Sequence, residues 1–203
     1  RQAFQPTRIY DRSGAPLYEI FEEGRRTRVA LADIPQHMID ATIATEDDTF
    51  WDNTGVDLPS ILRAAAQWIN QGEIVSGGST ITQQLVRLIA FDYEYRVEQS
   101  LQRKLEEAIL AMLLNERKSK SEILELYLNA VYYGNLAYGA EAAAQVYFGK
   151  PARELTLAQA ALLAGLPQSP AGLDPLSPDE ETRRAVKRRQ RTVLNLMVAH
   201  GYL

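Results

Sequence analysis

Four Ser/Thr-x-x-Glu/Gln patterns constrain the fold of this chain more than any other feature of its sequence. In such a capping box, two side chains satisfy backbone N–H groups that the first turn of a helix leaves free. Four boxes predict a mostly α fold, with the longest helices at about 97–116 and 178–199. The pairs are Thr80 with Gln83, Ser119 with Glu122, Thr156 with Gln159, and Ser177 with Glu180.

The first 31 residues have a different pattern. Short strands are predicted at 7–10, 17–21 and 27–31, separated by turn residues. Beyond them, Pro35 suits the first turn of a helix, and Asp57 can cap another helix that ends near Gly72. We therefore expect residues 1–31 to form a β-hairpin or linker region that packs on a main domain of residues 32–203.

Composition excludes several classes of protein. The 203 residues are 46% apolar, which is enough for a folded core. A net charge of −4 indicates neither a nucleic-acid partner nor an acidic tail. The chain has no cysteine, so disulfides and thiolate metal sites are excluded. We find no run of about 18 apolar residues and no signal peptide, and we expect an excised piece of a longer protein.

Two carboxylates precede two aromatic residues in the stretch from Glu46-Asp47 to Phe50-Trp51. The carboxylates fall at the predicted end of a helix, where the helix dipole disfavours negative charge. Aromatic neighbours can desolvate a carboxylate and raise its pKa toward the range that is useful for proton transfer. An acidic helix end in solvent is the structural alternative.

A run of hydrogen-bonding side chains follows a Gly-Gly pair at a predicted helix start. Free N–H groups there can bind an anion, and the glycines let a ligand approach the backbone. This arrangement suits a sugar or a phosphate, whereas an ordinary capped helix with a polar face is the alternative. The run is Gly77-Gly78-Ser79-Thr80-Ile81-Thr82-Gln83-Gln84, with Arg87 one turn further on.

Arg103 and Lys104 lie four and three residues before Glu107 and share one helix face with it. They can form a pair of cations for a pyrophosphate, oriented by the carboxylate, or only an exposed ion pair. Three further polar residues interrupt an otherwise apolar helix, and a buried carboxylate among them would need partners. We interpret these three as structural: Glu125, Tyr127 and Asn129.

In their order, these segments resemble the motifs of the peptidoglycan glycosyltransferase family. This family is the lysozyme-like domain of bifunctional penicillin-binding proteins and of monofunctional transglycosylases. The resemblance covers roughly residues 8–203. Asn53 stands where the family usually has His. Because Asn cannot titrate, we expect this residue to have a positional role and not to act as the base. Five motifs carry the resemblance: Glu46-Asp47 with Phe50, Asn53 and Gly55; Gly77 to Leu85; Arg103-Lys104 with Glu107; Ile123 to Asn129; and Gly139 to Lys150.

The resemblance implies a lysozyme-like helical domain, mostly α with a small N-terminal β element. It implies an inverting enzyme that polymerises lipid II, with the growing lipid-linked glycan as donor. Glu46 would be the catalytic base, and Glu107 a second essential carboxylate that faces Glu46 across a cleft without touching it. The implied substrate-binding residues are Asp47, Phe50, Asn53, Ser79, Thr80, Gln83, Gln84, Arg87, Arg103 and Lys104.

A lipid substrate implies contact with a membrane surface. The segment from Leu88 to Tyr95 is apolar and aromatic, which suits insertion at the interface, although a core segment is the alternative. We expect this segment to be solvent-exposed or poorly ordered. The last helix is basic from Arg183 to Arg191, and we interpret it as a solvated face rather than a patch for lipid headgroups.

The resemblance also implies the setting of the domain. We expect the extracytoplasmic face of a bacterial cell membrane, an N-terminal anchor outside this fragment and a fused transpeptidase domain. It requires no cofactor, leaves a divalent cation such as Mg²⁺ or Mn²⁺ open, and assigns no metal ligand. Two other functions stay open. A lysozyme-like hydrolase would need no cationic cluster, and an inactive scaffold would not need Glu46 and Glu107.

Overall fold

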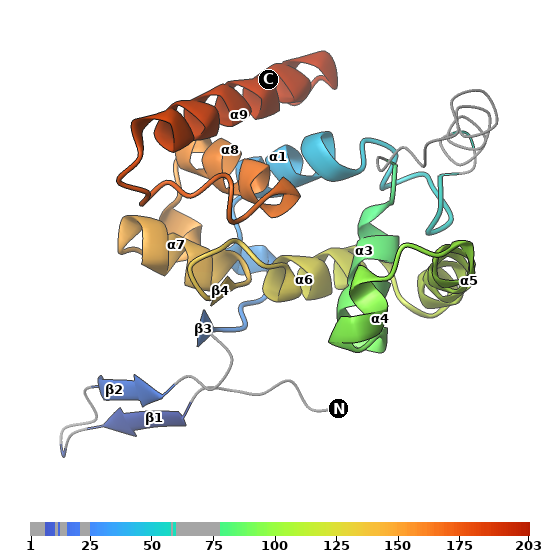
Figure 1. Ribbon diagram of the computed structural model, residues 1–203, viewed down its shortest axis with the longest axis horizontal. Coiled ribbons are helices and arrows are strands. Elements are labelled where there is room, and N and C mark those ends of the chain that lie inside the picture. Colours follow the sequence, from blue (N-terminus) through green and yellow to red (C-terminus); the bar gives the residue numbers. More distant parts are fainter. Residues whose placement is uncertain (1–6, 11, 13–15, 21–24, 58, 60–77) are drawn as a thin grey trace.

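The computed structural model describes residues 7–10, 12, 16–20, 25–57, 59 and 78–203, and its helices build most of the body (Figure 1). The predicted helix from Asp57 to Gly72 lies almost wholly outside these residues. The described helices are α1 (Gln36–Glu46), α3 (Ile81–Ala90), α4 (Tyr93–Val97), α5 (Leu101–Arg117), α6 (Lys120–Ala130), α7 (Ala140–Phe148), α8 (Leu157–Gly165) and α9 (Glu180–Ala199).

Two packed groups of helices organise this body. α1 packs against α8 and α9, and α3 packs against α5 and α6 (Figure 1). The main core is apolar and joins the two groups, with fully buried Met38 and Ile43 from α1, Ile81 and Leu85 from α3, and Leu128 from α6. Burial of these side chains supplies the main driving force for this arrangement. The C-terminal end of α1 and the N-terminal end of α3 are therefore held on one continuous core.

The capping boxes explain where three of the described helices begin. Both hydrogen bonds of the box are present at Thr80, Ser119 and Thr156, so three of the four predicted boxes are confirmed. The fourth is wrong, because Asp179 caps α9 by accepting from the Thr182 N–H, while Ser177 Oγ accepts from the Asp179 N–H. A carboxylate is a stronger acceptor for helix N–H groups, and it also complements the helix dipole.

The predicted long helix at about 97–116 begins later than expected. The Ser100 side chain accepts from the Arg103 N–H and starts α5 at Leu101. The preceding residues form the separate short helix α4, which Asp92 caps. The expected exposure of the segment from Leu88 to Tyr95 is confirmed, because Ile89 is 58% and Tyr93 76% exposed.

Two of the three predicted strands are present. β1 (Thr7–Tyr10) pairs with β2 (Pro16–Ile20) in an antiparallel hairpin. β3 (Arg25–Arg26) makes a short parallel pair with β4 (Ala137–Tyr138). The division of the chain at residue 31 stays a proposal.

The predicted strand at 27–31 is wrong, because side chains of α6 take its backbone groups. Asn129 accepts from the Val29 N–H at 2.9 Å and donates to the Val29 carbonyl at 2.9 Å. Glu125 accepts from the Leu31 N–H at 3.0 Å. These bonds satisfy the backbone as a neighbouring strand would, so no strand partner is needed.

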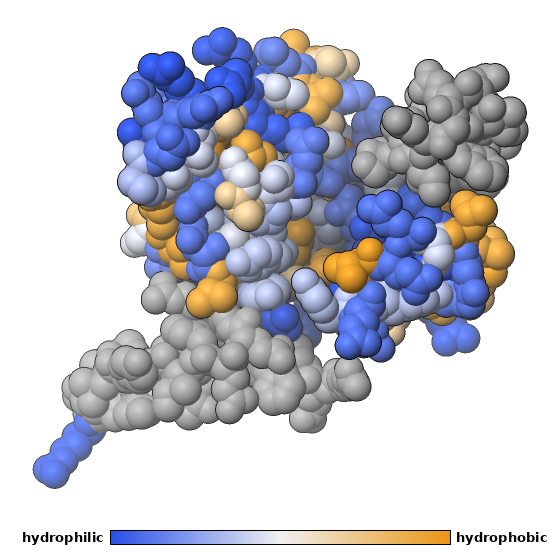
Figure 2. All heavy atoms as spheres, viewed as in Figure 1, coloured by the Kyte–Doolittle hydropathy of each residue, from blue (hydrophilic) through white to orange (hydrophobic). Residues whose placement is uncertain are grey.

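Exposed apolar side chains line one face of α5. Leu101, Leu105 and Ile109 follow each other at four-residue spacing and are 62%, 63% and 45% exposed, with Leu113 a further turn along. Residues four apart lie on the same side of a helix. Figure 2 shows apolar side chains at the end of the molecule formed by α4 and α5. Among the described residues, no helix has the length and apolar character needed to cross a bilayer.

Gly55 sets the approach of the first-motif loop to α5. Its φ is +95°, and an added Cβ would lie 2.5 Å from the Ala111 carbonyl oxygen, which is backbone and cannot move aside. We expect Gly55→Ala to lower the free energy of unfolding by about 2–4 kcal/mol, from overpacking and backbone strain combined. Urea unfolding measures the change.

Gly149→Ala is the matched control for this prediction. Gly149 also has a positive φ, +65°, but an added Cβ meets no atom within 4 Å. It should cost only the strain of the left-handed conformation, about 1 kcal/mol. Equal losses in the two variants would contradict the role of the Ala111 contact.

Candidate active site

The candidate site lies where the end of α1, the start of α3 and the first turns of α5 meet. α1 ends at Glu46, and the next residue, Asp47, is buried. Asp47 Oδ2 accepts from the Ile81 N–H, the first residue of α3, at 3.0 Å. This bond joins the first two motifs across 34 residues of sequence. The geometry of the site therefore depends on a buried carboxylate at a helix N-terminus.

Glu46 is a half-buried carboxylate with one close polar partner. Gln84 Nε2 donates to Glu46 Oε2 at 2.8 Å. Burial raises the pKa of the Glu46 carboxyl, while the Gln84 hydrogen bond and the charge of Arg189 act in the opposite direction, and Asp47 adds a small increase. A carboxyl with a raised pKa is suited to accept a proton near neutral pH.

Asp47 is anchored by three further contacts, which engage both of its carboxylate oxygens. Thr49 Oγ1 donates to Oδ1 at 3.1 Å, and Asn53 Nδ2 donates to the two carboxylate oxygens at 2.9 and 3.1 Å. Asn53 is itself fixed, because its Oδ1 accepts from the Gly55 N–H and from Lys120 Nζ, both at 3.0 Å. The positional role predicted for Asn53 agrees with these contacts.

Lys120 is a site residue that sequence reasoning missed. Its ammonium lies 4.8 Å from the centroid of the Phe50 ring, in addition to its bond with Asn53. Burial lowers the pKa of Lys120, against the opposing charges of Asp47 and Asp52. One sequence signal was available, because a lysine at the first position of α6 opposes the helix dipole and needs a compensating partner.

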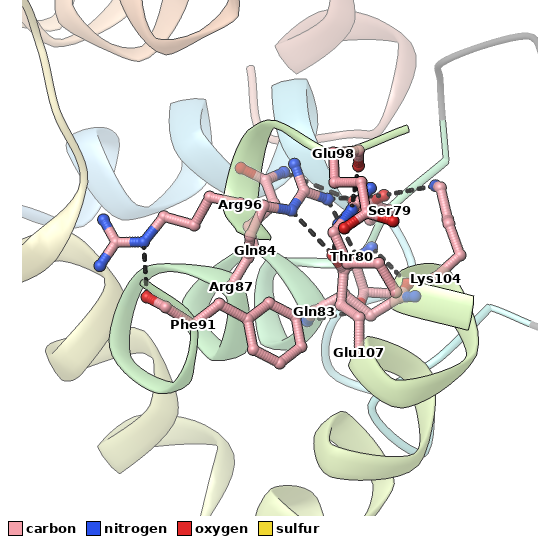
Figure 3. A network of polar contacts seen from close by, with 11 residues as sticks. Ser79, Thr80, Gln83, Gln84, Arg87, Phe91, Arg96, Glu98, Lys104 and Glu107 are labelled. Atoms are coloured by element: carbon pink, nitrogen blue, oxygen red, sulfur yellow. Dashed lines mark hydrogen bonds and ion pairs between the residues drawn. The ribbon is translucent and has the colours of Figure 1, made fainter. Parts of the chain in front are cut away.

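A second cluster surrounds the fully buried carboxylate of Glu107 (Figure 3). Arg87 binds it with two bonds, Nε to Oε2 at 2.8 Å and Nη2 to Oε1 at 3.0 Å. Arg103 Nη1 donates to Oε2 at 2.6 Å. Charged, bidentate bonds of this kind are short and directional. Two guanidinium groups therefore share one carboxylate.

Ser79 is the point where the cations meet. Its Oγ accepts from Arg87 Nη2 at 3.3 Å and from Lys104 Nζ at 3.2 Å. Burial lowers the pKa of Lys104, although the charge of Glu107 acts in the opposite direction. The Arg87 side chain is 31% exposed and Lys104 is half-buried, so both can reach a ligand. Arg103 is buried, with Nε on the Glu98 carbonyl at 2.6 Å, and it holds Glu107 in position.

Three residues predicted to bind substrate are buried as supports. Phe50 is fully buried in the core, and its ring makes the cation–π contact with the Lys120 ammonium. Thr80 and Gln83 cap α3, and Thr80 Oγ1 also donates to the Gly55 carbonyl at 2.6 Å. The Thr80 hydroxyl and the Oε1 atom of Gln83 are thus bound within the protein. Phe50, Thr80, Gln83 and the anchored Asp47 thus support the site from within the protein, and their direct contact with a substrate stays a prediction.

The three residues predicted to be structural lie on α6, and each of them forms hydrogen bonds within the protein. Glu125 accepts from Arg28 Nη2 at 3.0 Å as well as from the Leu31 N–H, which holds the pKa of this carboxyl below its ordinary value. Asn129 binds the backbone of Val29. Tyr127 is fully buried and donates from its hydroxyl to Gln84 Oε1 at 3.0 Å. Tyr127 therefore also contacts the site.

Arg189 of α9 is a second residue that sequence reasoning missed, because the basic residues of this helix were interpreted as a solvated face. Its Nε donates to the Gly165 carbonyl at 3.2 Å, and its stem packs where a Cβ on Gly165 would lie. Its charge favours the ionised form of Glu46. The signal was its spacing, since Val186, Arg189 and Val193 follow each other on the buried stripe of α9.

The donor set does not fit a divalent cation. Both oxygens of Glu107 are bound by guanidinium groups, and the charge of the Lys104 ammonium also interacts with this carboxylate. Mg²⁺ requires several free oxygen ligands. Within the described part of the chain, no three His, Cys, Asp or Glu side chains come together as metal ligands. Glu107 therefore has no carboxylate oxygen free of a guanidinium bond to offer to such an ion.

The two clusters differ in the chemistry that they can perform. Glu46 can take up a proton. Arg87, Lys104 and Ser79 offer donors to a developing negative charge, as preorganised sites do in acyl and phosphoryl transfer. Gln84 and Ser79 lie between the clusters, because Gln84 Nε2 is 2.8 Å from Glu46 and 3.4 Å from the Ser79 carbonyl. The predicted separation of Glu46 and Glu107 across a cleft stays a prediction.

Comparisons with known proteins identify the family. The model of the transglycosylase family matches residues 13–198. Penicillin-binding protein 1A is 44% identical over 199 residues in Pseudomonas aeruginosa and 45% in Aquifex aeolicus, covering 98% of this chain. A crystal structure of penicillin-binding protein 1A from Haemophilus influenzae matches with a TM-score of 0.51 and 29% identity, over 98% of this chain and 19% of that one.

The chain therefore belongs to the transglycosylase family, the peptidoglycan glycosyltransferase domain of penicillin-binding proteins, and the predicted lysozyme-like fold class is confirmed. It spans about a quarter of the length of the curated relatives named above, 23% and 26%.

The two carboxylates should respond oppositely to neutralisation. The folded-state pKa of Glu46 is raised, so ionisation of this buried carboxyl lowers the free energy of unfolding. This loss is absent below the unfolded-state pKa and complete above the folded-state pKa. Glu46→Gln should therefore not lower stability at neutral pH. Glu107→Gln leaves two guanidinium groups without their counter-charge, and we expect a loss of about 3–5 kcal/mol.

Urea unfolding of both variants at neutral and mildly acidic pH measures these effects. The advantage of Glu46→Gln over the parent chain should shrink as pH falls through the raised pKa. A large loss of stability for Glu46→Gln at neutral pH would contradict this account of its burial.

Proposed function

We propose that this domain polymerises lipid II by transfer from a growing lipid-linked glycan. The reaction gives a β-1,4 linkage with inversion and releases undecaprenyl pyrophosphate. The observation that supports it best is the pair of clusters. A carboxylate with a raised pKa lies beside cations that converge on the Ser79 hydroxyl. Such a pair suits a sugar hydroxyl that loses its proton while a pyrophosphate departs.

The proton and the leaving group are handled by different residues. Glu46 takes the proton from the acceptor hydroxyl as the new glycosidic bond forms on the face opposite the departing pyrophosphate. Arg87 and Lys104 stabilise the charge on the pyrophosphate, and the planar fork of Arg87 suits a phosphate oxygen pair. Glu107 and Arg103 orient the cations through the short bonds described above.

The apolar face of α5 supports contact with a membrane surface. Its exposed leucine and isoleucine side chains lie on the helix that also carries Arg103, Lys104 and Glu107. A lipid-linked substrate enters from a bilayer, so this surface and the cations would meet the lipid and its pyrophosphate together. We place the domain at the extracytoplasmic face of the bacterial membrane, within a longer protein that carries a transpeptidase domain.

A glycan hydrolase is the other function that a lysozyme-like fold allows. Hydrolysis would use carboxylates flanking the scissile bond and would not need clustered cations. Here the second carboxylate is fully buried and bound by Arg87 and Arg103, so it cannot act on a sugar directly. This geometry favours the transferase.

Glu46→Gln should abolish polymerisation while leaving the fold intact. General-base catalysis contributes about 10²–10⁴-fold, so the rate should fall by at least about a hundredfold. The assay follows lipid II in detergent and resolves glycan strands on a gel, with muramidase digestion to identify them. Asp40→Asn is the control, because Asp40 lies on α1 away from the described clusters and bonds to Gln36. Normal polymerisation by Glu46→Gln would remove Glu46 as the base.

Replacing Leu105 and Ile109 together with serine should weaken binding to phosphatidylglycerol-containing vesicles by at least about tenfold. Each side chain is exposed in the free domain, so the fold should tolerate the change, whereas burial in lipid would be lost. Vesicle co-sedimentation measures binding. Leu136→Ser provides the control, since Leu136 is 61% exposed beside β4, at the other end of the molecule (Figure 1). Equal loss in both variants would contradict a specific α5 surface.

A further inference from the structure

The side-chain amide of Gln84 is bound on both of its ends. Nε2 donates to Glu46 Oε2 at 2.8 Å and approaches the Ser79 carbonyl at 3.4 Å. Oε1 accepts from the Tyr127 hydroxyl at 3.0 Å. In the opposite orientation, Oε1 would face a carboxylate and a carbonyl, both of which are acceptors. The contacts therefore define one orientation of the amide.

Tyr127 supplies the hydrogen that fixes Oε1. It is fully buried, and burial together with the nearby carboxylates Glu46 and Asp47 raises its pKa well above the ordinary value. The phenol thus stays protonated over the whole range in which an enzyme works, and it acts as a donor. Because α6 is anchored in the main core by Ile123, Leu124 and Leu128, this donor has a fixed position.

These contacts form a chain from the core to the candidate base. We propose that Tyr127 is a positioning residue that acts through Gln84 to hold the Glu46 carboxylate in place and in its ionised form. Tyr127 does not touch the substrate. The inference rests on the proposed role of Glu46 as base, and it adds a residue that serves that role from inside the core.

Other charged and titratable groups also face Glu46. Asp47 follows it in the chain, Arg189 approaches from α9, and Tyr133 is a second buried tyrosine that interacts with it. α8 has no titratable residue. Asp47 opposes ionisation and Arg189 favours it, whereas the neutral Tyr133 changes little at working pH. Among the described residues, Tyr127 alone donates a hydrogen bond to the side-chain oxygen of Gln84.

The experiment compares Tyr127→Phe with Tyr133→Phe, a change of the same size at an equally buried tyrosine. The titration of Glu46 is followed by ¹³C NMR of the chain labelled at glutamate carboxyl carbons, and the resonance is assigned by its loss in Glu46→Gln. We expect the Glu46 midpoint to move to higher pH in Tyr127→Phe and to stay in place in Tyr133→Phe. This readout needs no substrate.

The acidic limb of the polymerisation rate should move with the midpoint. At the acidic end, Tyr127→Phe should be about three- to tenfold slower than the parent chain, a loss typical of one hydrogen bond, while the rates converge at high pH. Gln84→Leu removes the direct bond to Glu46 and should shift the midpoint in the same direction by at least as much. Adding Tyr127→Phe to Gln84→Leu should cause no further shift, because Tyr127 then has no Gln84 amide to act through. Fully additive shifts in the double variant would contradict the proposal that Tyr127 acts through Gln84.

The outcomes separate the two proposals. An unchanged Glu46 midpoint in both Tyr127→Phe and Gln84→Leu overturns the positioning role, whatever the activity. If Tyr127→Phe does not fold, Gln84→Leu carries the same test, because Gln84 lies outside the apolar core. If both variants shift the Glu46 midpoint but the parent chain does not polymerise lipid II, the positioning role of Tyr127 stands and the proposed function is overturned.

Discussion

The hydrogen bond from the Ile81 N–H to Asp47 is the contact on which the site depends. It places a buried negative charge at the N-terminus of α3, where the helix dipole and a free N–H stabilise it. Glu46 precedes Asp47, and Gln84 and Arg87 lie one and two turns into α3, so this contact fixes the position of the Glu46 carboxylate relative to Arg87. Asn53 and Lys120 complete the anchor from the outer side.

Burial acts differently on the two carboxylates of the candidate site, Glu107 and Glu46. Glu107 is fully buried, and two guanidinium groups compensate its charge. Glu46 has one amide donor and a more distant cation, so burial is only partly offset and its pKa rises. A compensated carboxylate organises its neighbours, whereas an undercompensated one can exchange a proton. The same residue type thus has two roles, and its partners decide between them.

Local sequence patterns predicted the helices well, and long-range contacts explain most of the errors. The boxes at Thr80 and Ser119 contain all the atoms of their caps, so a pair of residues three positions apart was sufficient evidence for each. The strand expected at 27–31 failed because its partners are Asn129 and Glu125, about a hundred residues away. The motifs singled out Glu46, Arg87 and Glu107, which the structure places in the two clusters of the candidate site. A motif does not distinguish a ligand contact from an internal support, so the burial of Phe50 and Thr80 was not foreseen. Lys120 and Arg189 come close to these clusters only through the fold.

The two cationic contacts of Ser79 determine the direction of its own hydrogen. A hydroxyl oxygen has two lone pairs and one proton, and here Arg87 and Lys104 each approach the oxygen as donors. Both lone pairs are then occupied, so the hydroxyl can contribute only its proton to an incoming group. Two positive neighbours also polarise the O–H bond. Ser79 therefore behaves at this site as a third donor that accepts nothing from a ligand, which makes the site selective for groups rich in acceptor oxygens.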